Sequence, residues 1–171
     1  MKRSFLLLIF SIFIIHTHAQ IIKKYPVNKS GCFVYMFCDP AKFDEDFSQD
    51  SSKVYSATCT KDEIHYGVIC AKLLKPVDDL DEAQELVASY LDYLKVDFEI
   101  KSAVGYGKGN HLNSNENTRG IVDYWTDKEN NNWKVKAWTD GKFIAVLYAY
   151  IKTEVPVKVD VFLNGFRFPG M

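Results

Sequence analysis

The segment that most constrains the fold of this chain is residues 133–151, with the sequence WKVKAWTDGKFIAVLYAYI. Two alternating, β-prone runs flank Asp140-Gly141, a dipeptide typical of two-residue turns in β-hairpins. Such a turn pairs Ala137 with Ile144 and makes one face of the hairpin apolar throughout. The segment therefore predicts the centre of an antiparallel sheet with one face in the core.

A third β-prone run, residues 120–126, precedes this hairpin. If Thr126 lies opposite Trp133, Val122 and Tyr124 join the apolar face, and aromatic and lysine side chains gather on the other face. An apolar patch rimmed by lysines is typical of an interaction surface, unless a helix covers it. The residues expected on this interaction face are Asp123, Trp125, Lys134, Lys136, Trp138 and Phe143.

The first nineteen residues have the parts of a secretory signal peptide. Lys2 and Arg3 give a positive start, residues 5–15 are an apolar stretch too short to cross a membrane, and Ala19 ends an acceptable cleavage site. We expect residues 1–19 to be removed, leaving a lead-in over residues 20–30 and one domain over residues 31–171. The expected location is secreted or periplasmic, with no membrane span after cleavage.

The composition of the remaining 152 residues restricts the partners. They carry 19 basic and 22 acidic side chains, a formal charge of −3. A negative balance argues against nucleic acid or an anionic membrane as the main partner. Only His65 and His111 remain, and most histidine-based catalysis needs more than that.

The four cysteines, Cys32, Cys38, Cys59 and Cys70, lie close together in the sequence, and export to an oxidising compartment favours disulfides. If strands 31–38 and 53–60 pair with Cys38 opposite Lys53, Cys32 falls opposite Cys59, and this is the favoured disulfide. Cys70 faces the same side, but no second pairing follows. The spacings contain no C-x2-C, so a metal or redox site is the less favoured interpretation.

The remaining elements indicate an α+β fold. Strands are expected at residues 31–38, 53–60, 65–74 and 98–104. Asp79-Leu80-Asp81-Glu82 has the form of a helix N-terminus, and apolar residues at helical spacing follow it to Leu94. Pro156 favours the start of a short final helix. Strands on both sides of one helix predict an antiparallel β-sheet layered with helices.

Two polar segments are alternative ligand sites. Residues 39–52 contain Asp44, Glu45, Asp46 and Asp50, which suit calcium, but the spacing of an EF-hand is missing, so a solvated loop is favoured. Residues 105–120 are rich in glycine and asparagine, but no helix follows to complete a phosphate cradle. This second loop is long enough for partner contacts, and His111 in it is a candidate contact residue. The sequence assigns no catalytic residue, no metal ligand and no cofactor.

The order of these elements resembles the PsbP-like domain family, which includes DcrB-like envelope proteins and the Mog-type Ran-binding fold. The residues that carry the resemblance are residues 66–69 (YGVI), the meander at 119–126 and 133–150, and residues 162–166 (FLNGF). The four cysteines and the acidic segment 39–52 depart from the family pattern. The resemblance implies an α/β/α sandwich with a non-catalytic binding or assembly role.

The sequence therefore predicts a secreted or periplasmic binding or assembly module, whose partner is a protein or a small molecule. Two other classes remain open. One is a cysteine-dependent envelope redox protein or another enzyme. The other is a calcium- or metal-dependent surface protein.

Overall fold

The computed structural model describes residues 21–171, so the expected signal peptide lies outside the described part of the chain. Within that part, 44% of the residues are in strands, and two α-helices accompany a mostly antiparallel sheet. The predicted mixed α+β class is confirmed at this level. Over residues 21–171, no helix has the length and hydropathy that are needed to cross a membrane.

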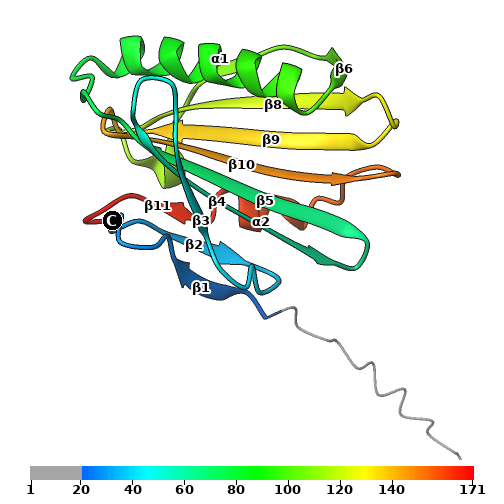
Figure 1. Ribbon diagram of the computed structural model, residues 1–171. Coiled ribbons are helices and arrows are strands. Elements are labelled where there is room, and N and C mark those ends of the chain that lie inside the picture. The colour runs from blue at the N-terminus through cyan, green and yellow to red at the C-terminus, as the bar shows by residue number, and fades with distance from the viewer. Residues whose placement is uncertain (1–20) are drawn as a thin grey trace, which may run out of the picture.

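The larger of two sheets has eight strands, each antiparallel to its neighbours (Figure 1). In chain order they are β3 (Asp44–Phe47), β4 (Lys53–Lys61), β5 (Ile64–Lys72), β6 (Ile100–Ala103), β7 (Gly107–Asn110), β8 (Arg119–Asp127), β9 (Asn132–Thr139) and β10 (Phe143–Ile151). Their order in the sheet is β3-β4-β5-β10-β9-β8-β6, and β7 also pairs with β8. The hairpin predicted at residues 133–151 is β9 and β10, and it lies at the centre of this sheet.

The smaller sheet has three antiparallel strands in the order β1-β2-β11. These are β1 (Lys23–Pro26), β2 (Phe33–Met36) and β11 (Phe166–Arg167). The small sheet and α2 (Val159–Leu163) lie on one face of the large sheet, and α1 (Leu80–Asp97) lies across the other (Figure 1). A 3-10 helix, η1 (Leu112–Ser114), connects β7 to β8.

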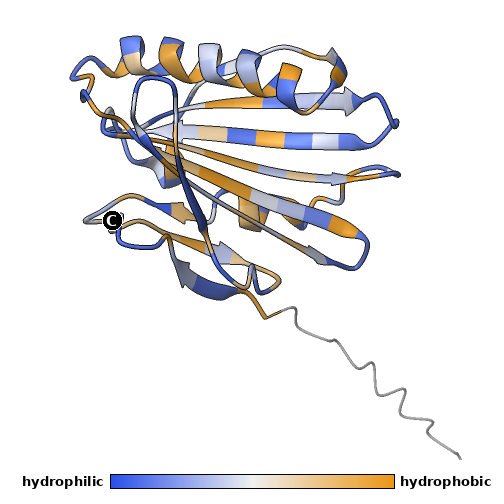
Figure 2. Cartoon of the chain, viewed as in Figure 1, coloured by the Kyte–Doolittle hydropathy of each residue, from blue (hydrophilic) through white to orange (hydrophobic). Residues whose placement is uncertain are grey.

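Each face of the large sheet has its own core. Val135 and Val146 are fully buried under α1, whereas Tyr66 and Leu147 are buried on the side of α2 and the small sheet. Figure 2 shows apolar residues concentrated in central strands such as β10, while β3 is mostly hydrophilic. Strands that are covered on both faces have no polar side, which explains the continuous apolar sequence of β10.

Helix α1 begins where the sequence predicts. The Asp79 carboxylate accepts hydrogen bonds from the backbone N–H groups of Asp81 (2.8 Å) and Glu82 (3.2 Å), which occupies donors that the first turn leaves free. The residues that the apolar stripe buries are Ala83, Val87, Ala88, Leu91 and Leu94. They pack on β8 and β9, so α1 shields that part of the sheet.

The β9–β10 hairpin has the predicted faces but not the predicted partners. Ala137 pairs with Val146 rather than Ile144, because four residues instead of two lie between Thr139 and its partner, which is Ile144 and not Lys142. The Asp140 carboxylate accepts hydrogen bonds from the N–H groups of Lys142 (2.9 Å) and Phe143 (2.8 Å), which widens the turn. A shift of two residues keeps every side chain on its face, so the apolar face survived the wrong register.

The register of β8 was predicted wrongly by one residue, and this error exchanges its two faces. Trp125, not Thr126, lies opposite Trp133. Trp125 therefore points towards α1, while Val122 and Tyr124 point to the opposite side. The cause is the connection to β9, where Asp127 closes a tight turn with its side chain.

The position of β2 also differs from the prediction. It pairs with β1 and β11 in the small sheet, and not with β4. The partner of β4 is β3, which lies inside the segment 39–52 that was expected to be a loop. Similarly, the expected loop over residues 105–120 contains β7 and η1. The predicted final helix is present as α2.

Candidate binding site

The residues predicted to form one interaction face are divided between the two sides of the sheet. Trp125 is buried under α1, whereas Trp138 and Phe143 are buried on the opposite side, under α2 and the small sheet. His111 is exposed between β7 and η1. Over residues 21–171, the aromatic patch that the sequence suggested is therefore absent.

Helix α2 covers the part of the face that contains the two lysines. Asp160 of α2 lies between them, with its carboxylate oxygens 2.7 Å from Lys134 Nζ and 3.0 Å from Lys136 Nζ. The indole N–H of Trp138 donates to the carbonyl oxygen of Leu163, at the end of the same helix (2.9 Å). The alternative that a helix covers this face is thus the correct one here.

With Thr126 opposite Trp133, Asp123 would lie beside Lys136 and Trp125 beside Lys134, but the observed register of β8 forms neither pair. Asp123 does not meet Lys136: it is buried, and its carboxylate lies 3.2 Å from Lys95 Nζ of α1. Lys134 does not meet Trp125: its ammonium lies 5.5 Å from the centre of the Tyr124 ring. Both changes follow from the reversal of the faces of β8.

We expect Asp160→Asn to lower the free energy of unfolding by about 2 kcal/mol, because it leaves two half-buried ammonium groups without a counter-ion. Burial alone raises the pKa of Asp160, but the hydrogen bonds from Lys134 and Lys136 outweigh it, so the pKa lies below its usual value. A lowered carboxyl pKa stabilises the fold at neutral pH, and this contribution is lost as the pH falls through the acid range. As the pH is lowered, the free energy of unfolding of the variant should therefore fall less steeply than that of the wild-type protein.

Urea denaturation at several pH values measures both effects. The control is Glu99→Gln, which removes an exposed partner of Lys128 and should cost less than about 0.5 kcal/mol. Equal losses in the two variants would show that α2 is not anchored by Asp160.

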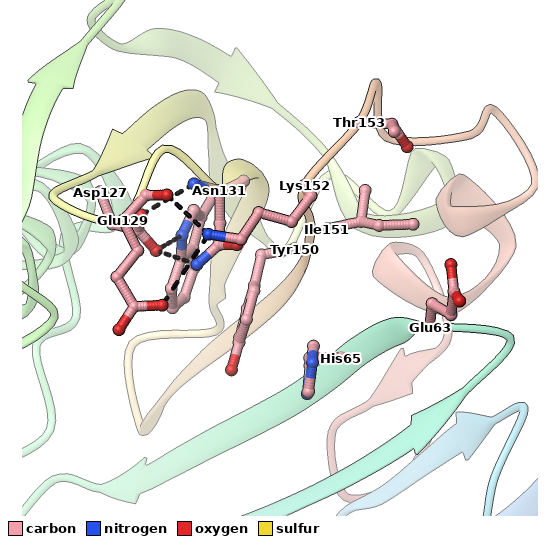
Figure 3. Close-up of a pocket in the computed structure, with 10 residues that line it drawn as sticks. Glu63, His65, Asp127, Glu129, Asn131, Tyr150, Ile151, Lys152 and Thr153 are labelled. Carbon is pink, nitrogen blue, oxygen red and sulfur yellow. Dashed lines mark hydrogen bonds and ion pairs between the residues drawn. The ribbon is translucent and has the colours of Figure 1, made fainter.

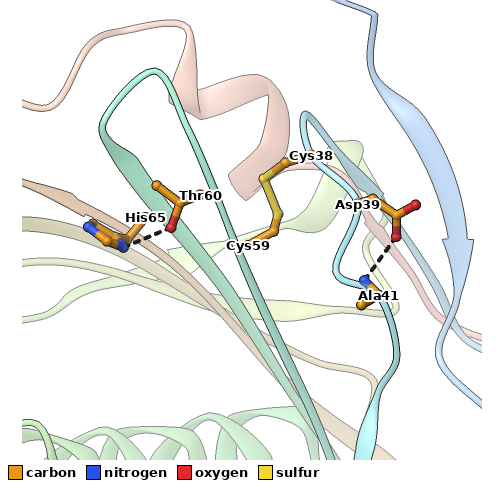
Figure 4. Close-up of a disulfide and its surroundings, with 6 residues drawn as sticks. All are labelled: Cys38, Asp39, Ala41, Cys59, Thr60 and His65. Carbon is orange, nitrogen blue, oxygen red and sulfur yellow. Dashed lines mark hydrogen bonds between the residues drawn. A yellow bond between two sulfur atoms is a disulfide. The ribbon is translucent and has the colours of Figure 1, made fainter.

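The structure contains one disulfide, and it is not the favoured one. Cys38, just after β2, is bonded to Cys59 of β4, with the Cα atoms 5.9 Å apart (Figure 4). The expected Cys32–Cys59 pairing required β2 and β4 to be neighbours, which they are not. Cys32 and Cys70 are buried as free thiols. Within residues 21–171, no group of three or more His, Cys, Asp or Glu side chains could hold a metal ion.

A row of stacked rings crosses the large sheet at the end opposite the β9–β10 turn. Trp125, Trp133, Tyr150 and His65 occupy directly paired positions on β8, β9, β10 and β5. The ring centres of Trp133 and Tyr150 are 4.1 Å apart, and those of Tyr150 and His65 are 4.5 Å apart, with nearly parallel planes. The rings of Trp125 and Trp133 are tilted by 38° with centres 6.3 Å apart, so the stack proper is Trp133, Tyr150 and His65, whose rings offer mainly their edges to a ligand.

Helix α1 covers only one end of this row. Phe98, the residue after the helix, stacks on Trp133 with ring centres 5.2 Å apart. Beyond it, Tyr150 is half-buried and His65 is exposed. Aromatic pairs of this kind contribute about 0.5–1.5 kcal/mol each beyond the area they bury. The row is therefore a rigid floor whose outer end is accessible.

Asp127, the last residue of β8, locks the indole of Trp133 in place. Its carboxylate accepts hydrogen bonds from Trp133 Nε1 (2.8 Å), Asn131 Nδ2 (2.7 Å) and the Asn131 backbone N–H (2.8 Å). Burial on its own raises the pKa of Asp127, but these hydrogen bonds outweigh it, and the pKa lies below its usual value. The carboxyl group of Asp127 is therefore ionised at neutral pH, and both of its oxygens already accept hydrogen bonds.

A cavity of about 730 Å³ lies over the accessible end of the row (Figure 3). The residues that line this polar cavity are Glu63, His65, Asp127, Glu129, Asn131, Trp133, Tyr150, Ile151, Lys152 and Thr153. Three of them, Glu63, Asp127 and Glu129, carry a carboxylate, and one, Lys152, carries an ammonium group. That ammonium, Lys152 Nζ, donates to the carbonyl oxygen of Glu129 (2.6 Å) and lies 4.0 Å from the Glu129 carboxylate, which leaves Glu63 and Asp127 without a cationic partner among the described residues of the lining. The lining therefore has an excess of negative charge.

The phenol of Tyr150 stays protonated in this environment. Burial raises its pKa, and the carboxylates of Asp127 and Glu129 raise it further. The hydroxyl can donate or accept a hydrogen bond at the floor of the cavity. Glu63, on the opposite rim, is exposed.

A second cavity of about 700 Å³ lies at the same end of the sheet and shares Trp133 with the first. Its lining includes Val104, Val155 and Val157 together with the charged residues Lys134 and Glu154. The segment between β10 and α2 contributes residues to both cavities, and Asn132 Nδ2 holds it through the carbonyl oxygen of Thr153 (3.1 Å). One end of the sheet thus has two adjoining cavities.

Beside the polar cavity, a hydroxyl group is hydrogen-bonded to an imidazole. Thr60 Oγ1 and His65 Nδ1 are 3.0 Å apart, and both residues are exposed. A catalytic pair needs a third group that orients the base, and in the described chain no carboxylate is hydrogen-bonded to this imidazole. The site offers hydrogen-bond acceptors, ring edges and negative charge.

Most residues of the cavity were not predicted from the sequence. Tyr150 and His65 were known only as members of strands, and Asp127 only as part of a loop. The sequence feature that could have located the cavity is the pair Trp125 and Trp133 on either side of that loop. The two side chains lie opposite each other only for one length of turn, and that length was not known from the sequence. Pairing positions on four strands are visible only when every turn between them is known.

Comparison with protein-family models and with curated protein sequences finds no match to this chain.

Proposed function

We propose that this protein is an exported, non-catalytic binding module, and that its polar cavity binds a small organic cation. The observation that carries this proposal is the rigid row of His65, Tyr150 and Trp133 beside an excess of carboxylates. A protonated amine or guanidinium supplies both the positive charge and the hydrogen-bond donors that such a lining lacks.

The geometry favours a preformed site. The indole N–H of Trp133 donates one hydrogen bond to Asp127, and two hydrogen bonds from Asn131 fix that carboxylate, so the floor of the cavity needs no rearrangement when a ligand enters. Sites that are ordered before binding lose less conformational entropy on association. Glu63 and Glu129 are exposed on the rim, and a cation competes there with the exposed ion pair between Glu129 and Lys152 Nζ at 4.0 Å.

Two further observations support the wider proposal. A disulfide between Cys38 and Cys59 is typical of proteins that fold in an oxidising compartment, as expected for a secreted or periplasmic protein. The placement of α1 on one face of the sheet, and of α2 with the small sheet on the other, supports the resemblance to PsbP-like domains.

Binding is tested with arginine methyl ester as the cationic probe, sorbitol as a neutral probe and glutarate as an anionic probe. We expect the arginine ester to shift the NMR signal of the Trp133 indole N–H and to bind more tightly than the other two. Glu63→Gln with Glu129→Gln should weaken its binding about tenfold, since each exposed charge contributes up to about 1 kcal/mol.

The matched control is Glu85→Gln, which removes a carboxylate of α1 that pairs with Lys108 outside both cavities. It should leave the affinity unchanged. Equal binding of all three probes, no shift at Trp133, or the same loss in the control would each contradict a cation site in this cavity.

A further inference from the structure

Two free thiols meet in the core between the two sheets. Cys32 and Cys70 are 2% and 0% exposed and belong to the same buried cluster. Cys32 lies just before β2, and Cys70 lies in β5, opposite Tyr55 of β4. Their side chains are close enough to share a hydrogen bond.

The pair mirrors the disulfide at the other end of β2. Cys32, Val34 and Met36 point inward and are buried, and Cys38, which is half-buried just after the strand ends, packs against the same cluster. Cys38 at the far end is bonded to Cys59 of the large sheet (Figure 4). Each end of β2 therefore places one cysteine beside a cysteine of the large sheet.

We propose that Cys32 and Cys70 form a second disulfide, so that both ends of β2 are tied covalently to the large sheet. Formation breaks two S–H bonds, makes one S–S bond and releases two protons and two electrons. The oxidant is a protein or small-molecule disulfide of the oxidising compartment, which is reduced to two thiols. The proposal rests on the export that the proposed function includes.

The chemistry of the pair indicates which sulfur attacks. The hydrogen bond from the Cys70 thiol is the main reason that the pKa of Cys32 lies below its usual value, and it outweighs the effect of burial. The same contact, together with burial, raises the pKa of Cys70. Since the thiolate is the nucleophile, Cys32 attacks the oxidant and Cys70 then displaces it.

Burial restricts when this reaction occurs. An external disulfide cannot reach sulfurs that are almost fully covered, so oxidation takes place before β2 closes on the large sheet, or when β2 opens transiently. A metal site is the poorer explanation of the pair. Zinc sites use three or four protein ligands, and residues 21–171 contain no group of three or more ligating side chains.

The test is disulfide mapping of the protein produced from the full chain and recovered after export from a bacterial host. Alkylation in denaturant without reductant should add no label, and alkylation after reduction should add four. Proteolysis should release a Cys32–Cys70 cross-linked peptide. Two labels before reduction, or cross-links from Cys32 to Cys59 and from Cys38 to Cys70, would overturn the proposal.

Refolding separates this proposal from the proposed function. The reduced, denatured protein is refolded in a buffer of reduced and oxidised glutathione, which requires neither export nor a ligand. Formation of the Cys32–Cys70 bond there supports the pair even if the host retains the protein or the cation probe does not bind. Failure to form it there refutes the pair, whatever the outcome of the binding assay.

A variant that lacks the first disulfide provides an independent measurement. Cys38→Ala with Cys59→Ala should still form the Cys32–Cys70 bond, and its Tm should fall by about 5–10 °C when reductant is added. The matched variant replaces all four cysteines with alanine, at positions Cys32, Cys38, Cys59 and Cys70. Its Tm should not change when reductant is added. A Tm that does not respond to reductant in the first variant would also count against the second disulfide.

Discussion

Gly141→Ala is expected to destabilise the fold by about 3–4 kcal/mol, the largest effect of any single substitution considered, because it combines backbone strain with a steric clash. Gly141 has a φ of +80°, in the region that favours glycine. A Cβ atom there would lie 2.3 Å from the carbonyl oxygen of Val77. This neighbour is backbone and is held in place, since the N–H of Val77 donates to the carbonyl oxygen of Gly141 (2.8 Å).

The control is Gly109→Ala in β7. Gly109 has nearly the same φ, +78°, but a Cβ atom there meets nothing within 4 Å. It should cost only the strain, about 1 kcal/mol. Equilibrium urea denaturation, followed by tryptophan fluorescence, measures both variants. Equal losses of stability in the two variants would show that the turn between β9 and β10 makes no close steric contact with the segment that leads into α1.

Cys38→Ala with Cys59→Ala is expected to lower the free energy of unfolding by about 3 kcal/mol, because the disulfide closes a loop between residues 21 positions apart and so restricts the unfolded chain. The bond also joins the end of β2 in the small sheet to β4 in the large sheet. Its loss should therefore loosen the small sheet more than the β9–β10 hairpin, which hydrogen exchange can resolve by segment.

The comparison is made with the wild-type protein, with and without excess reductant. In the oxidised state, the difference in the free energy of unfolding should appear in full. In reductant it should disappear, because neither protein then holds a disulfide. A variant as stable as the oxidised wild type would mean that the bond between Cys38 and Cys59 contributes no net stability.

The binding proposal depends on features that the disulfides do not control. The polar cavity is built from the ends of β8, β9 and β10 and from the turn before β5, all in the large sheet. The disulfide pairs lie on the side of the small sheet. Loss of Cys38–Cys59 is therefore expected to lower stability while leaving the affinity for arginine methyl ester in the folded protein unchanged.

The candidate site shows why strand patterns alone do not locate a binding surface. The sequence pattern predicts Trp125 and Trp138 on the same face of the sheet, but a shift of one residue in β8 puts them on opposite sides. The turn that causes this shift is held by the Asp127 side chain and by Asn130, which has a φ of +64°. Neither residue type specifies such a turn without its neighbours.

The sequence by itself determined the α+β class, the central β9–β10 hairpin and the start of α1 at Asp79. These features depend on local patterns: a period of two in strands, a period of 3.6 in the helix, and a capping side chain. The apolar face of the hairpin was correct despite a wrong register, because a shift of two residues does not exchange the faces of a strand.

Only the tertiary structure decided which strands are neighbours, and with them the disulfide and the cavity. β2 was a recognisable strand, but its apolar face fits any apolar sheet, so its sequence did not select β1 and β11 over β4. The Cys38–Cys59 bond and the row from Trp125 to His65 arise from contacts between distant segments. Hydrophobic burial is non-directional, so the turns and the packing of whole layers, rather than any single strand, selected these partners.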